Sequence, residues 1–141
     1  MADNRVIVRQ IEAAWDRNDL AVLDQYFAPD FNNAQSGFPG LPAGLAGAKM
    51  AHGMAMAAFP DRKVKILDVI ADGDKVSVRT QITGTNTGGA AFLGAPQPNG
   101  AKIDFEAWGI YQLRDGKVVA HWGINDAVTG MIQGGALKPP M

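Results

Sequence analysis

The second half of the chain alternates apolar and polar residues over four stretches, and this pattern constrains the fold most. The stretches are 64–71, 76–85, 102–114 and the segment between Asp115-Gly116 and Asp126. A period of two predicts β-strands that bury one face. The turn formers Asp72-Gly73-Asp74 and Asp115-Gly116 separate neighbouring stretches, and tight turns of this kind join antiparallel strands. The sequence therefore predicts an antiparallel sheet.

The first half of the chain is predicted to be helical. Ile7, Ile11 and Trp15 recur at four-residue steps, which is typical of an amphipathic helix. A second, short helix is expected after Asp19 and ends at Pro29, and a third runs from about 45 to 59. The segment 30–44 between them is predicted to be a loop at a pocket rim or lid. Helices followed by strands indicate the α+β class. A strongly curved sheet covered by three helices would leave a cone with a cavity.

Length and charge narrow the function further. The 141 residues suit a single domain, 1–141, and the net charge of −1 without a basic run gives no sign of nucleic-acid or membrane binding. Cysteine is absent, which excludes disulfides and thiol chemistry and fits a cytoplasmic location. No apolar run approaches the ~20 residues of a membrane span. With two histidines, His52 and His121, and no ligand spacing, we expect no metal.

The strand after Asp115-Gly116 leads to a lone carboxylate, Asp126. Regular alternation places Val118, Ala120, Trp122 and Ile124 on one face, and Asp126 continues that face. In a pocket the carboxylate would lose water, its pKa would rise, and it could exchange protons near neutral pH. Alternatively, Asp126 lies beyond the strand and caps a helix over 127–132. Both alternatives remain open from the residues alone.

The order of motifs along the chain resembles that of SnoaL-like polyketide (ester) cyclases, a family of the nuclear-transport-factor-2-like superfamily. The motifs that carry this resemblance are Trp15, the segment 23–31, the segment Ala58-Phe59-Pro60-Asp61, Gly73-Asp74-Lys75-Val76, Arg79, Gly84-Thr85, Gly88, Phe92-Leu93-Gly94, Asp115-Gly116-Lys117, and His121-Trp122 with Asp126. The resemblance covers nearly the whole chain. It implies an α+β cone-shaped barrel of a curved antiparallel sheet wrapped round three N-terminal helices, a deep apolar pocket, and a homodimer formed through the sheet.

The resemblance also implies an activity without a cofactor, in which Asp126 is the general acid/base of an intramolecular aldol closure. Two positions depart from the family pattern, since Asn32-Asn33-Ala34 and Asn86 stand where histidines are usual. Asparagine forms hydrogen bonds but does not exchange protons near pH 7. The same superfamily includes isomerases, dehydratases, epoxide hydrolases and proteins that only bind ligands, and the fold does not choose among them.

Several polar and aromatic residues are candidates for contact with a flat, apolar, polycyclic ligand. The aromatic candidates are Trp15, Tyr26, Phe59, Trp108 and Trp122. Asn33 and Gln35 are candidates for orienting a carbonyl. His52 is either a satisfied core histidine or a pocket histidine, whereas His121 is expected at the surface or behind the site. Arg79 is a rim charge or is paired with Asp104, Glu106 or Asp126.

The strand over 102–114 offers two possible pocket faces. One face carries Phe105, Ala107, Gly109 and Tyr111, which suits a concave surface; the other carries Glu106, Trp108, Ile110 and Gln112, which offers more chemistry. Gln81 stands where an epoxide hydrolase would need a second carboxylate, so that reaction is disfavoured. We therefore expect a cofactor-independent cyclase or isomerase-type enzyme for a polyketide-like carbonyl compound. The alternatives are a non-catalytic small-molecule binding protein, or a related epoxide hydrolase or dehydratase.

Overall fold

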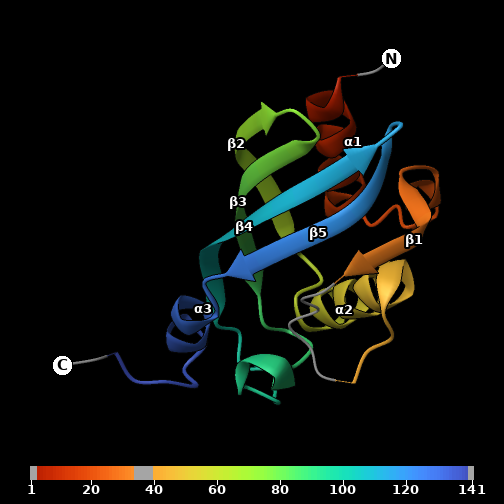
Figure 1. Ribbon diagram of the computed structural model, residues 1–141. Coiled ribbons are helices and arrows are strands. Elements are labelled where there is room, and N and C mark those ends of the chain that lie inside the picture. The colour runs from red at the N-terminus through yellow and green to blue at the C-terminus, as the bar shows by residue number, and fades with distance from the viewer. Residues whose placement is uncertain (1–2, 34–39, 140–141) are drawn as a thin grey trace.

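The computed structural model describes residues 3–33 and 40–139, with the side chains of Asn32 and Asn33 excepted. In chain order its elements are α1 (Asn4–Asp16), the 3-10 helix η1 (Ala21–Gln25), β1 (Phe27–Asn33), α2 (Gly44–Ala58), β2 (Lys63–Asp72), β3 (Lys75–Thr85), the 3-10 helix η2 (Ala91–Leu93), β4 (Lys102–Arg114), β5 (Lys117–Asn125) and α3 (Ala127–Gln133). In Figure 1 a curved sheet wraps around α1 and α2, and α3 follows the end of β5. The predicted α+β class and the curved sheet are confirmed.

The sheet has the strand order β1-β5-β4-β3-β2 and is not closed into a barrel. The pairs β2–β3, β3–β4 and β4–β5 are antiparallel, as the turn signals predict. The pair β1–β5 is parallel, so the sheet is mixed rather than purely antiparallel. One helix, α3, comes from the C-terminal end of the chain rather than from the N-terminal half.

The segment around Pro29 was predicted wrongly. It was expected to end a helix and start a loop, but residues 27–33 form the edge strand β1. Proline has no N–H to donate and is therefore tolerated in a strand at the edge of a sheet. Phe27 and Phe31, four positions apart, are both buried and their rings meet edge to face at 4.8 Å. A four-residue step of apolar residues fits one helix face and also one strand face, which explains the error.

The core lies between the inner face of the sheet and the helices. Buried residues of α1 (Ile7, Val8, Ile11) meet Val76 and Val78 of β3 and Val118 of β5. A second cluster around Phe59 and Ile103 lies near the end of α2. Among the described residues, no helix is long and apolar enough to cross a membrane.

A β-bulge in β5 decides which residues face the core. Val118 pairs with Leu113 and Ala120 pairs with Gln112, so Val119 is an extra residue on β5. An extra residue moves every later side chain to the opposite face. As a result, Val118 faces inward whereas Trp122 and Ile124 face outward. Regular alternation had placed these three residues on one face, which is wrong.

Candidate functional site

Trp15 and His52 meet on the inner side of the sheet. The two rings lie 5.0 Å apart, one from α1 and the other from α2. His52 is buried, and its Nε2 is 2.9 Å from Oδ1 of Asn18. Burial, with a smaller contribution from the nearby Arg62 cation, lowers the pKa of His52 to about 4. These are the contacts of a satisfied core histidine, and they keep the ring neutral at physiological pH.

Tyr111 connects this pair of rings to a carboxyl group. The buried phenol donates a hydrogen bond of 2.7 Å to Oε1 of Glu12 and is also hydrogen-bonded by the Trp15 side chain. Burial raises the pKa of Glu12, while Tyr111 and the Arg62 cation oppose that rise. Burial likewise lowers the pKa of Arg62, whose Nη1 is buried without a hydrogen-bond partner among the described residues.

His121 also faces inward, at the position opposite Tyr111 across β4 and β5. The two rings are 4.5 Å apart. The imidazole lies against Gly109 and Gly123, because a Cβ on these glycines would come within 2.8 Å of Nε2 and 3.0 Å of Cε1, respectively. Burial lowers the pKa of His121 to about 4. The sequence predicts His121 at the surface or behind the site, whereas in the structure it lies on the inner face, beside Tyr111.

Asp126 is the N-cap of α3. Its Oδ1 accepts from the Thr129 N–H at 3.1 Å and its Oδ2 from the Thr129 hydroxyl at 2.5 Å. The carboxylate is exposed, and these two hydrogen bonds lower its pKa. Its contacts are thus those of the helix-cap alternative. It borders a cleft of about 330 Å³ that is lined by Leu67, Gln81, Asp104, Phe105, Glu106, Asp126 and Thr129.

Four candidate ligand contacts lie on the outer face of the sheet, away from the helices. Trp108 is 61% exposed, and Trp122 is paired in register with Ile110 on the same face. Arg79 forms ion pairs of 2.7 Å with Asp68 and Glu106. Gln112 donates to Asp74 at 2.9 Å. The small-residue face of β4 is the inner one, so none of these four side chains lines the interior. The ion pair of Arg79 with Glu106 is one of the pairings that the sequence predicts.

The remaining candidates are distributed over other parts of the fold. Phe59 is a core residue whose Cβ would be 2.9 Å from a Cβ on Gly84. Tyr26 donates to Gln10 at 3.0 Å near the molecular surface. The side chain of Asn33, and Gln35 as a whole, lie outside the described residues.

Asn86, one of the positions where the resemblance leads us to expect a histidine, organises a loop. It is buried, accepts from the Gly89 N–H at 2.8 Å, and donates to the Gln97 carbonyl at 3.3 Å. Both bonds are to backbone groups, so an amide, which donates and accepts at once, suits this position. The departure from the family pattern at Asn86 therefore has a structural explanation.

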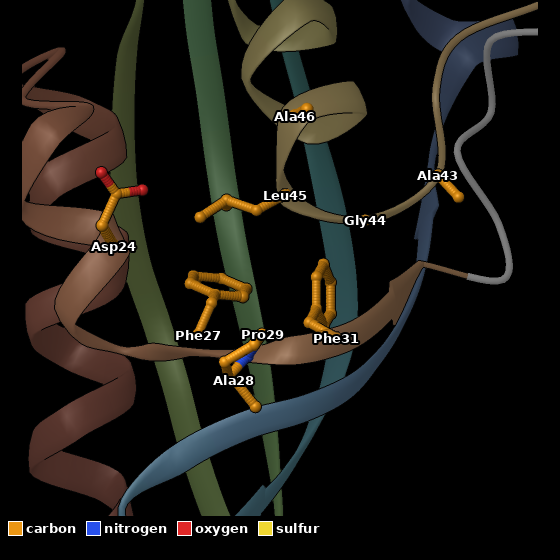
Figure 2. A pocket seen from close by; sticks show the side chains of 9 residues that line it. All are labelled: Asp24, Phe27, Ala28, Pro29, Phe31, Ala43, Gly44, Leu45 and Ala46. Atoms are coloured by element: carbon orange, nitrogen blue, oxygen red, sulfur yellow. The ribbon is translucent and has the colours of Figure 1, made fainter.

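A second cleft of about 490 Å³ opens between β1 and the start of α2 (Figure 2). Phe27 and Phe31 project from β1 toward Leu45, and Asp24 lies at the edge, where it pairs with Lys49 at 2.7 Å. The complete lining is Asp24, Phe27, Ala28, Pro29, Phe31, Ala43, Gly44, Leu45 and Ala46. The lining side chains are apolar except for Asp24, and the cleft is open to solvent.

Comparison with known proteins identifies the family. The model of the SnoaL-like polyketide cyclases matches residues 5–134. The chain belongs to the SnoaL-like polyketide cyclase family. No curated protein sequence matches this SnoaL-like chain significantly.

Solved structures with the same fold accompany this family match. A proposed polyketide cyclase from Bacillus cereus is 28% identical, with a TM-score of 0.79 over 93% of this chain and 79% of that one. IdmH, a proposed polyketide cyclase from Streptomyces antibioticus, is 26% identical, with a TM-score of 0.81 over 95% and 99%. TsrD from Streptomyces laurentii has a TM-score of 0.83 over 97% and 99%, and at 24% identity it shows the fold alone.

Sequence reasoning missed Glu12 and the inward orientation of His121, and it named Tyr111 only as part of one of the two possible pocket faces of the strand 102–114. Glu12 leaves the apolar repeat of α1 unbroken and is one polar residue among others on the helix, so nothing in the sequence distinguishes it. The paired strand glycines 109 and 123 were a usable signal, because glycine in a strand interior often marks a place where another group approaches closely. Together with His52 and Trp15, these residues form an inner polar cluster of neutral imidazoles, a phenol and a carboxyl group.

Proposed function

We propose that this SnoaL-like protein is a cofactor-independent cyclase or isomerase-type enzyme acting on a polyketide-like carbonyl compound. The observation that carries the proposal is the family match across residues 5–134. Its geometric support is the inner polar cluster, where two imidazoles with pKa values of about 4 stay neutral at pH 7. A neutral imidazole carries both a lone pair and an N–H, as proton transfer requires.

The test is the conversion of a panel of polycyclic β-keto esters by the purified chain without added cofactor. Ring closure by an intramolecular aldol reaction conserves mass, so liquid chromatography should show a new species with the mass of the substrate. If every ester is recovered unchanged at high protein concentration, the enzymatic proposal fails.

The resemblance assigns the proton transfer to Asp126, and a matched set of variants tests that assignment. Asparagine is as good an N-cap as aspartate, so Asp126→Asn keeps the cap and removes the ionisable group. Asp126→Ala removes both. If Asp126 is the acid/base, both variants lose activity; if Asp126 serves only α3, Asp126→Asn retains activity and only Asp126→Ala is destabilised.

The capping contacts of Asp126 specifically favour a second candidate, a small-molecule binding protein of the same fold. In that case polycyclic esters bind without conversion. Isothermal titration beside the conversion assay separates the two, since binding without product supports the second candidate.

We further propose that the protein forms a homodimer through the outer face of the sheet. Trp108, Ile110, Trp122 and Ile124 are exposed neighbours on β4 and β5. A contiguous exposed apolar patch of this kind is characteristic of an interface. Sedimentation equilibrium should give a dimer that Ile124→Lys converts to a monomer, whereas a monomeric wild type would contradict the proposal.

A further inference from the structure

His121 occupies a place on the inner face that two strand glycines leave open. Gly109 and Gly123 are directly paired across β4 and β5, and neither has the positive φ that would itself require glycine. Glycine in a strand interior costs about 0.5–1 kcal/mol relative to alanine. What the two glycines provide is space, since a Cβ at either position would press on the imidazole.

The imidazole has no hydrogen-bond partner within residues 3–33 and 40–139, and the aromatic ring beside it is that of Tyr111. The side chain is only partly buried. His52 differs in this respect, because Asn18 engages its Nε2. Of the two neutral imidazoles, His121 is therefore the one that no described residue engages through a hydrogen bond.

The groups around His121 hold it in place. On the sheet, the Tyr111 ring packs against it at a tilt of 44°, and the phenol is in turn fixed by Glu12 and Trp15 from α1. On the helical side, the ring of His52 packs against that of Trp15 at a tilt of 45°. The charged group that faces this cluster is Arg62, which acts on Glu12 and His52. Rings from α2, α1, β4 and β5 thus form one continuous row that ends at His121.

We propose that His121 is the catalytic residue that moves the proton in the cyclisation, and that Tyr111 and the glycine pair are positioning residues. The inference rests on the proposed function, and it places the chemistry on the inner face rather than at Asp126. The substrate class it implies is a carbonyl compound with an activated α C–H, small enough at its reacting end to approach a partly buried ring.

The reaction balances without any further reactant. A ring nitrogen of His121 takes the proton from the carbon between two carbonyl groups, which gives an imidazolium and an enolate. The enolate carbon attacks a second carbonyl of the same molecule, forming one C–C bond and converting that C=O to an alkoxide. The alkoxide then takes the proton back from the imidazolium, so the product is an isomer of the substrate. A base with a pKa of about 4 compares with the carboxylate bases that enolise ketones.

The experiment compares His121→Gln and Gly109→Ala with Gly53→Ala as the matched control. Gly53 lies on α2 with nothing within 4 Å of an added Cβ. We expect His121→Gln to lower kcat on a converted β-keto ester by about 10²–10⁴-fold. Gly109→Ala displaces the ring, so it should lower kcat and move the NMR-titrated pKa of His121 toward its usual value. Gly53→Ala should change neither quantity.

A chemical measurement on the wild type covers the case in which His121→Gln does not fold. Diethyl pyrocarbonate acylates neutral, accessible imidazoles, and we expect peptide mapping at pH 6 to show His121 labelled before His52, with inactivation following the label on His121. Full activity of a folded His121→Gln variant, or of protein labelled at His121, would overturn the inference while leaving the proposed function intact. A wild type that converts no ester overturns both.

Discussion

The hydrogen bond from Tyr111 to Glu12 leads to a quantitative prediction about stability. Tyr111→Phe removes the donor 2.7 Å from the Glu12 carboxyl group, together with the hydroxyl that the Trp15 side chain bonds. Hydrogen bonds to charged groups contribute about 1.5–3 kcal/mol. Glu12 keeps part of its surface exposed, which places the expected loss near the lower end, at about 2 kcal/mol where the carboxyl group is ionised.

The loss should depend on pH in a defined direction. Burial raises the folded-state pKa of Glu12, so the stability linked to this group is present below its unfolded pKa and is lost as pH rises through the folded value. The Tyr111 bond opposes that rise. Tyr111→Phe therefore raises the folded pKa further, and its cost grows with pH. Near pH 4 the carboxyl is largely protonated, and the cost falls to about 1 kcal/mol, as for a neutral hydrogen bond.

Urea unfolding at pH 4, 5.5 and 7 measures this cost, with Glu12→Gln as the background that removes the ionisation. In that background Tyr111→Phe should cost about the same at each pH, since a neutral amide accepts the bond throughout. A cost for Tyr111→Phe that is independent of pH in the Glu12 protein, or identical in both backgrounds, would refute the reasoning about a buried, hydrogen-bonded carboxyl group.

Three further predictions follow from individual contacts. Hydrogen bonds lower the pKa of Asp126. The stability that this carboxylate gives α3 is therefore present above its unfolded pKa and is lost as pH falls through the folded pKa. Thermal melts of wild type and Asp126→Ala should converge in acid and separate at pH 7. Gly47→Ala would place a Cβ 1.8 Å from the Pro42 carbonyl oxygen and should destabilise by about 1–3 kcal/mol in urea unfolding; an unchanged midpoint would contradict this packing. Gly53→Ala should instead stabilise by up to about 1 kcal/mol through helix propensity, and a loss of stability would show an unseen contact.

The fold class could be predicted because its signals are local. Alternation over residues 76–85 and 102–114, with glycine turns between strands, specifies hairpins without knowledge of the rest of the chain. The edge strand β1 could not be predicted, because its pairing partner is nearly ninety residues away and its Phe27–Phe31 spacing also fits a helix. Its parallel register with β5 depends on tertiary packing, which periodicity does not report.

The candidate site was harder to predict, because a single residue reverses the face assignments on β5. Val119 is accommodated as a bulge, and this turns His121 inward and Trp122 outward. Hairpin logic assumes unbroken alternation, so Trp122 was assigned to a pocket that it does not line. On β4 the alternation leaves open which of the two faces is the inner one, and the structure places Trp108 and Gln112 on the outer face. The glycines at 109 and 123 are the sequence signal of the close approach of the imidazole to these two strands. Their meaning becomes clear only once the two strands are in register.

The most direct test of the account is to incubate the wild-type chain with a polycyclic β-keto ester in the presence of a chelator and to follow the mixture by chromatography and mass spectrometry. The account predicts a product with the mass of the substrate but a different retention time, formed at a rate proportional to protein concentration. Binding of the ester without any such product would contradict the enzymatic account and identify the chain as a ligand-binding member of its family.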